Sequence, residues 1–264
     1  MTQHLDLTVV MPVYNEEGAV AEVVRAWDSE LGRLGIAYEL RVYDDGSRDR
    51  TGEVLVDLSH ELPRLLVTRH ANRGHGPTIL RGYREARGDW VFQTDSDGEM
   101  EPDSFPVLWE RRGDYDFLFG IRAGRQWTPA RWVMTRGSRL AVRALFGGGV
   151  ADVNTPYRLM RRERLAPLVE TLPDDLFAPN VILSGLAVRE GLRIWQTSVP
   201  HQGRRHGGGS LVSLGKIART AMRSLRQTLA VARSGKPKPA TTRPSPPPGG
   251  AAPGTRAASA GRAC

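Results

Sequence analysis

The chain has 264 residues, of which 40% are hydrophobic and 25% are charged, a composition typical of a globular enzyme and not of a fibrous or disordered protein. It contains no apolar window of about 18 residues, so we expect no transmembrane helix, and its first residues lead into a predicted strand without a signal peptide. The single cysteine, Cys264, excludes an intrachain disulfide. We therefore expect a cytoplasmic protein.

The positive charge is confined to the C-terminal part. The net charge is +8, yet residues 204–264 hold 12 Lys and Arg and no Asp or Glu. Residues 1–203 therefore hold 25 basic and 29 acidic residues. A basic protein often binds nucleic acid. Here the part with enzyme-like motifs is slightly acidic, so no nucleic-acid partner is expected.

Strands and helices alternate along the first hundred residues. Apolar runs typical of strands occupy residues 5–11, 38–43, 65–68 and 90–93, and helical patterns occupy residues 17–34, 51–60 and 77–86. Further helices are predicted at 104–111, 130–146, 163–171 and 178–190, with strands at 116–120 and 193–197. This alternation predicts an α/β fold with a Rossmann-like, mostly parallel sheet covered by helices on both faces. We assign it to one domain, residues 1–210.

Two different segments follow this domain. Residues 211–234 carry apolar residues at three- and four-residue steps with cationic residues beside them, which predicts an amphipathic helix. Such a helix fits an anionic membrane surface, and it fits equally well a helix docked on its own domain. Residues 235–264 contain seven prolines among Gly, Ala, Ser and Thr, which predicts a disordered tail.

Three carboxylates follow the apolar run at 90–93. Asp95, Asp97 and Glu99 occupy alternate positions, and in extended chain such residues point to one side. Converging oxygen donors suit Mg²⁺ or Mn²⁺. The alternative is a polar turn, because Asp, Ser and Gly favour turns.

Two earlier strand ends are also polar. The first strand runs into PVYNEE (residues 12–17) and the second into DDGSRDRT (residues 44–51), and ligands of open α/β sheets bind at such ends. The Tyr14 ring is suited to pack on a nucleobase, and the Asp45 carboxylate to accept a hydrogen bond from an imide N–H. Helix capping by Ser47 or Asp49 is an alternative, but it does not explain two adjacent acids before a glycine.

Four motifs in order, PVYNEE, DDGSRDRT, NRGHG (residues 72–76) and DSD (residues 95–97), resemble family 2 glycosyltransferases of the GT-A fold. The wider layout, over residues 5–210, resembles the polyprenol-phosphate glycosyltransferase branch, which includes dolichol-phosphate mannose synthase. The resemblance implies a metal-dependent, inverting transfer of a sugar from a GDP- or UDP-linked donor to a polyprenyl phosphate, by a protein peripheral at the cytoplasmic membrane face. Alternatives are a soluble or glycan hydroxyl acceptor, and a nucleotide-sugar-binding protein without catalysis.

The resemblance also implies roles for the donor-side residues. The nucleotide-sugar-binding positions are Pro12, Tyr14, Glu16, Asp45, Asn72, Gly74 and Asp95, with Gly76 completing the segment that lets backbone approach the ligand. The metal ligands for Mg²⁺ or Mn²⁺ are Asp95, Asp97 and Glu99. Glu99 stands where this branch often has Gln, a departure that adds negative charge and leaves the base and sugar open.

The acceptor-phosphate positions implied by the resemblance are Arg122, Arg131, Thr135, Arg205 and Ser210. Arginine suits phosphate because its planar fork offers paired donors, although a surface arginine on a basic helix explains Arg131 equally well. The catalytic positions are Asp95, Asp97, Asp152, Arg122 and Arg205.

The segment DVNTPYR (residues 152–158) occupies the place of the branch's D-x-x-x-G-[FY]-R, with Pro156 replacing Gly. The resemblance places Asp152 and Arg158 near the donor sugar or the acceptor. Asp152 is the expected general base if the acceptor is a hydroxyl, whereas an ionised phosphate needs none. For His201 and His206 we predict no metal role, because no third soft ligand is near them in the sequence.

Overall fold

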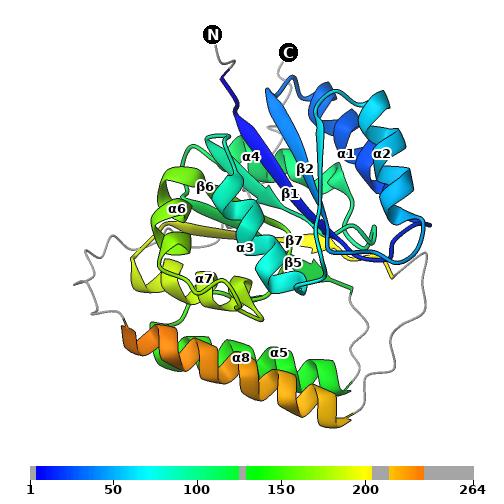
Figure 1. The fold of residues 1–264 in the computed structure, drawn as a ribbon. Helices are drawn as coiled ribbons and strands as arrows, with labels where there is room; N and C mark the ends of the chain where they lie inside the picture. The colour runs from blue at the N-terminus through cyan, green and yellow to red at the C-terminus, as the bar shows by residue number, and fades with distance from the viewer. Residues whose placement is uncertain (1–3, 125–128, 204–213, 235–264) are drawn as a thin grey trace, which may run out of the picture.

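The computed structural model describes residues 4–124, 129–203 and 214–234 (Figure 1). Its centre is a seven-stranded sheet in the order β3-β2-β1-β4-β6-β5-β7. The strands are β1 (Leu7–Val13), β2 (Tyr38–Asp44), β3 (Leu65–Arg69), β4 (Trp90–Gln93), β5 (Phe117–Ala123), β6 (Arg158–Arg161) and β7 (Ile194–Pro200). Of these strands only β6 runs against its neighbours. The predicted mostly parallel α/β sheet is confirmed.

Helices cover both faces of the sheet. One apolar cluster receives side chains from α1 (Val20–Arg33), α2 (Thr51–Glu61) and α4 (Phe105–Arg111), the last preceded by the short 3₁₀ helix η1 (Pro102–Ser104). The opposite cluster receives them from α3 (His75–Glu85), α6 (Arg162–Glu170) and α7 (Pro179–Arg189). Neighbouring strand residues divide between the clusters, as with Val9 and Val10, because strand side chains alternate. Burial on both faces explains why the strands read as continuous apolar runs.

Two long helices form an outer layer. α5 (Pro129–Phe146) and α8 (Leu214–Ser234) lie side by side beyond α7 (Figure 1). On α8, Thr228 and Val231 are buried, and the Gln227 side chain accepts a 2.9 Å hydrogen bond from the Phe177 N–H. The amphipathic helix therefore docks on its own domain. Among the helices described, none is long and apolar enough to cross a membrane.

The strands differ from the predicted ones where they approach the candidate site. β1 continues to Val13 and β5 to Ala123, so Arg122 lies within a strand. β6 was not predicted, because its four residues include an arginine at each end. It forms a strand because it pairs with β4 on one side and β5 on the other. The boundary at residue 210 and the tail predicted at 235–264 lie outside the described residues.

Candidate functional site

A cavity of about 310 Å³ opens where β1, β2 and β4 end, beside the loop that follows β3. All seven residues expected to bind a nucleotide sugar line it: Pro12, Tyr14, Glu16, Asp45, Asn72, Gly74 and Asp95. Val13, His75, Ser96 and Asp97 complete the lining. The residues meet because the carboxyl ends of parallel strands share one edge of the sheet.

The loops after β1 and β2 hold each other in place. The Asn15 N–H donates to Ser47 Oγ (3.0 Å) and the Arg48 N–H donates back to Asn15 Oδ1 (2.8 Å). The Glu16 N–H donates to Thr51 Oγ1 at 2.8 Å. Asn15 adopts a φ of 55°, in the left-handed region that Asn tolerates better than most residues. Several polar side chains of these two motifs therefore hold the cavity wall in shape, a role that the sequence did not indicate.

Asp45 organises the glycine-containing loop. Its carboxylate accepts hydrogen bonds from the N–H groups of Arg73 (2.7 Å) and Gly74 (2.9 Å). Each carboxylate oxygen has a second acceptor site, so its contact with a base stays a prediction. Gly74 has a φ of +95° and open space beside it, whereas a Cβ on Gly76 would lie 2.0 Å from the carbonyl oxygen of Leu176. Gly76 therefore serves packing and does not line the cavity, and its expected role in backbone approach to a ligand stays a prediction.

Asp95 and Asp97 are arranged to receive a cation. Asp95 Oδ1 is buried and, among the described residues, has no hydrogen-bond partner. Burial raises the pKa of Asp95, although the nearby His75, whose Nε2 is 3.8 Å from Oδ1, opposes this. Asp97 lines the same cavity, and its Oδ1 accepts the Glu99 N–H at 3.1 Å. Two carboxylates, one of which has a buried oxygen without a hydrogen bond among the described residues, fit Mg²⁺ or Mn²⁺.

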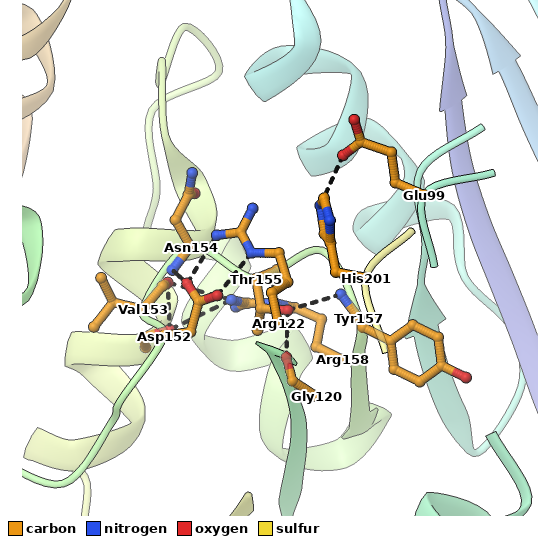
Figure 2. Close-up of polar contacts among 11 residues, drawn as sticks. Glu99, Gly120, Arg122, Asp152, Val153, Asn154, Thr155, Tyr157, Arg158 and His201 are labelled. Atoms are coloured by element: carbon orange, nitrogen blue, oxygen red, sulfur yellow. Dashed lines mark hydrogen bonds and ion pairs between the residues drawn. The ribbon is translucent and has the colours of Figure 1, made fainter. Parts of the chain in front are cut away.

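Glu99 turns toward His201 (Figure 2). The distance from Glu99 Oε2 to His201 Nε2 is 2.9 Å, and the Gln202 N–H donates to the Glu99 carbonyl at 2.8 Å. Within the described ranges no group of three His, Cys, Asp or Glu is spaced to hold a metal ion. The expected convergence of three carboxylates is not formed there, because the chain bends at Gly98, with a φ of 69°, and extended-chain alternation does not apply. Glu99 as a metal ligand stays a prediction.

A second, smaller cavity adjoins the first. It is lined by Asp95, Asp97, Glu99, Met100, Arg122, Pro156 and His201. Asp95 and Asp97 line both cavities. The two acids therefore stand between the predicted nucleotide residues and Arg122, which is predicted to bind the acceptor phosphate.

Arg122 and Asp152 form a bidentate salt bridge (Figure 2). Arg122 Nε donates to Asp152 Oδ2 (2.7 Å) and Nη2 to Oδ1 (2.9 Å). Only 10% of the Arg122 side chain and 8% of the Asp152 side chain are exposed. Each carboxylate oxygen keeps a second acceptor site while Arg122 is bound, so the general-base role of Asp152 stays a prediction.

Arg158 lies beneath the 152–157 segment and does not reach either cavity. Its side chain is fully buried, and it donates to the carbonyls of Thr155 (2.9 Å) and Val153 (3.3 Å). The guanidinium also stacks on Phe119, with its central carbon 4.7 Å from the ring centroid. The expectation that Arg158 approaches donor or acceptor is corrected: it holds the segment that carries Asp152.

The other residues predicted to bind the acceptor phosphate are not found in the two cavities or lie outside the described part of the chain. Arg205 and Ser210 lie outside the described residues, as does the Arg131 side chain on α5. Thr135 lies on α5 and lines neither cavity. Of the two predicted acceptor residues whose side chains the structure describes, Arg122 lines a cavity of the site and Thr135 does not.

His75 is a site residue that the sequence analysis missed. It lines the larger cavity at the first position of α3, where the unpaired N–H groups of a helix favour an anion. The available signal was its place within NRGHG, between the two glycines.

A known family model matches more than half of this chain. The model of the family described as glycosyl transferase family 2 matches residues 8–168. The chain is 33% identical over 204 residues to undecaprenyl-phosphate 4-deoxy-4-formamido-L-arabinose transferase of Pseudomonas aeruginosa, covering 76% of this chain and 59% of the relative. The corresponding transferase of Pectobacterium atrosepticum is 28% identical, covering 76% and 61%. The chain thus spans about three fifths of the length of these curated relatives.

Solved structures share the fold. Mannosyl-3-phosphoglycerate synthase from Rubrobacter xylanophilus superposes with a TM-score of 0.62 at 16% identity, covering 87% of this chain and 74% of that one. Glucosyl-3-phosphoglycerate synthase from Mycobacterium tuberculosis, in complex with Mn²⁺, UDP-glucose and phosphoglyceric acid, gives 0.61 at 19% identity, covering 87% and 80%. At these identities the likeness establishes the fold, which confirms the predicted GT-A architecture.

Proposed function

Because the chain belongs to glycosyl transferase family 2, we propose that it transfers a sugar from a nucleotide diphosphate sugar to the phosphate of a polyprenyl phosphate. One observation carries the proposal: Asp95 and Asp97 line both the cavity of the predicted nucleotide residues and the cavity that contains Arg122. The second cavity has a volume of about 20 Å³, so a phosphate requires it to widen, and a donor in the first cavity and a phosphate at Arg122 would then meet at these two acids. The undecaprenyl-phosphate transferases that the chain resembles support this choice of acceptor.

In this proposal the larger cavity binds the nucleotide sugar, with the diphosphate of the donor next to Asp95 and Asp97. Tyr14 and Asp45 would hold the base of a UDP- or GDP-linked sugar. Asp95 and Asp97 would hold Mg²⁺ or Mn²⁺, which supplies the positive charge that neutralises a leaving diphosphate. The Mn²⁺ and UDP-glucose bound to the fold relative from Mycobacterium tuberculosis support this assignment.

The acceptor half orients an oxygen that is already ionised. A phosphate oxygen attacks the anomeric carbon while the bond from that carbon to the diphosphate oxygen breaks, so the configuration inverts in one displacement. Arg122 would bind the incoming phosphate with the guanidinium N–H groups that do not donate to Asp152, since Asp152 occupies Nε and one hydrogen of Nη2. Arg131, Thr135, Arg205 and Ser210 belong to the same proposed phosphate set. Catalysis then consists mainly of alignment and charge stabilisation.

The outer helix layer is proposed to attach the protein to the anionic cytoplasmic face of a membrane. Neither α5 nor α8 contains an acidic residue. Leu140 on α5 and Met222 and Leu225 on α8 are exposed, although α8 also buries residues against its own domain. Apolar side chains among cationic ones are typical of helices at an anionic membrane surface.

The proposal is tested by mixing the full chain with UDP- and GDP-sugars, Mn²⁺ or Mg²⁺, and a short polyprenyl phosphate. We expect a polyprenyl-phosphate sugar from one donor and no product when EDTA is present. Turnover with a soluble hydroxyl acceptor, but none with the lipid phosphate, would contradict the acceptor assignment. Nucleotide binding without turnover on any acceptor would contradict catalysis altogether.

Glu99→Gln is expected to improve donor binding. The Glu99 carboxylate lines the smaller cavity together with Asp97, so its negative charge would repel a diphosphate held at Asp97 by roughly 1–2 kcal/mol. The amide keeps a hydrogen-bond acceptor for His201. We expect KM for the nucleotide sugar, and the nucleotide Kd from calorimetry, to fall about fivefold, with the Mn²⁺ requirement unchanged within about twofold.

His201→Gln is the matched control for this variant, since it retains the Glu99 charge and removes only the ring. It should leave donor affinity unimproved. A tenfold loss of Mn²⁺ affinity in Glu99→Gln would show instead that Glu99 is a metal ligand.

A further inference from the structure

A separate cavity of about 270 Å³ lies at the carboxyl end of α5. Arg139 and Arg143, one helical turn apart, line it together with Val142 and residues 147–151 of the turn that follows. None of these residues lines the two cavities around Asp95 and Asp97. The proposed sugar transfer therefore gives this cavity no role.

Arg139 and Arg143 are exposed, and they differ from the paired arginines of another surface cavity, Arg81 and Arg84. In the described part of the chain, neither guanidinium has an ion-pair or hydrogen-bond partner. Arg81 and Arg84 also line a surface cavity, but Arg81 pairs with Glu85 at 2.8 Å and Arg84 with Asp174 at 2.6 Å. The cavity beside α5 thus has uncompensated positive charge, and its helix contains no acid.

The glycine turn adds backbone donors. The Gly147 N–H closes the helix by donating to the Arg143 carbonyl at 3.2 Å, whereas the N–H groups of Gly148 and Gly149 have no acceptor within the described ranges. Gly147 and Gly149 have φ values of +102° and +131°, which an L side chain would strain. A Cβ on Gly148 would lie 3.8 Å from Arg143 Nε, so the arginine stem lies along the turn. Consecutive backbone N–H groups in a tight turn form concavities that bind anions.

A simpler role explains only part of this arrangement. A cation in the last turn of a helix stabilises the exposed carbonyls there, and Arg143 is so placed. Arg139 lies a full turn earlier, and the helix end makes no use of the Gly148 and Gly149 N–H groups. A ligand with several acceptor oxygens in this cavity would meet the side chains of Arg139 and Arg143 and the backbone of the glycine turn, all of which line it.

We propose that this cavity binds a phosphate group, presented by a phospholipid headgroup or as a free anion. Two planar guanidinium groups and two backbone donors match the oxygens of a tetrahedral phosphate. The proposal does not depend on sugar transfer and is tested by binding alone.

The experiment compares R139Q/R143Q with R226Q/R233Q in the full chain. The control removes the same charge from exposed positions of α8, and neither of its residues lines the cavity. Inorganic phosphate binding is followed by ³¹P NMR. Vesicle binding is followed by cosedimentation with phosphatidylcholine mixed with phosphatidic acid or phosphatidylglycerol at matched surface charge. R139K/R143K serves as the charge-retaining variant, and circular dichroism checks that each protein is folded.

We expect R139Q/R143Q to bind phosphate at least tenfold more weakly, R226Q/R233Q to change less than twofold, and R139K/R143K to recover most of the affinity. If a phospholipid supplies the group, the wild type prefers phosphatidic acid and only R139Q/R143Q loses that preference. If the phosphate group comes from a free anion, R139Q/R143Q and R226Q/R233Q should lose vesicle binding to the same extent, because each removes two positive charges and neither removes a lipid-specific site. The site would be overturned if R139Q/R143Q bound inorganic phosphate as tightly as the wild type. It would also be overturned if R226Q/R233Q lost as much affinity for inorganic phosphate as R139Q/R143Q.

Discussion

Asp97→Ala is expected to lower the rate of sugar transfer by on the order of a thousandfold or more, because it removes one of two oxygen ligands proposed for the metal at the leaving diphosphate. The fold should survive. The side chain lies after the end of β4 and lines both cavities, and the hydrogen bond that Asp97 Oδ1 accepts from the Glu99 N–H is among the contacts that the substitution removes. Losing that bond costs about 1 kcal/mol of unfolding free energy. Transfer kinetics, Mn²⁺ titration calorimetry and thermal unfolding measure the three effects.

The matched control is Asp103→Ala. Asp103 is an exposed acid six residues away that lines neither cavity of the candidate site. It should leave transfer and Mn²⁺ affinity within about twofold, the usual range for surface substitutions. If Asp97→Ala retained normal activity and Mn²⁺ affinity, the site would be wrongly assigned.

Arg122→Gln is expected to affect activity and stability together. It removes the guanidinium proposed to bind the acceptor phosphate, which should lower kcat/KM for polyprenyl phosphate about 100- to 1,000-fold. It also leaves the buried Asp152 carboxylate without its partner. Breaking a buried ion pair in this way costs about 3–5 kcal/mol of unfolding free energy. Chemical denaturation and steady-state kinetics with varied acceptor measure both losses.

The double variant Arg122→Gln/Asp152→Asn separates the two effects. Two neutral amides can replace the ion pair without an uncompensated charge, so stability should recover by more than half, as a double-mutant cycle would show. Transfer should stay low, since no cation remains for the phosphate. Recovery of transfer along with stability would mean that Arg122 acts only on the fold.

The arrangement of the donor cavity was largely accessible from local sequence. Tyr14, Asp45 and Asp95 each follow an apolar run, and parallel strands bring their carboxyl ends to one edge, so knowing the strands was enough to predict that these side chains meet. The sequence could not show that Asp45 also binds the loop at Gly74, or that Asn15 and Ser47 fasten two loops together. Such contacts join residues about thirty positions apart, and no local pattern records them.

Glu99 and Arg158 show where reading from local pattern fails. The spacing of Asp95, Asp97 and Glu99 predicts convergence only while the chain stays extended, and the bend at Gly98 removes that condition. The family-like motif at 152–158 places Arg158 near the ligands, but β6 pairs between β4 and β5 and buries it. A four-residue strand with two charged ends owes its conformation to neighbouring strands, because its own residues do not favour it.

The sequence by itself determined the α/β alternation, the family, through its ordered motifs, and the residues that line the larger cavity, because strand periodicity, motifs and strand-end chemistry are local properties. Only the tertiary structure decided that Asp95 and Asp97 are shared by two cavities, that Arg122 is paired with Asp152, and that Glu99 faces His201. It also decided that α8 docks beside α5. Each of these depends on which distant segments pack together, and packing is set by the whole sheet and its buried faces, not by any one segment.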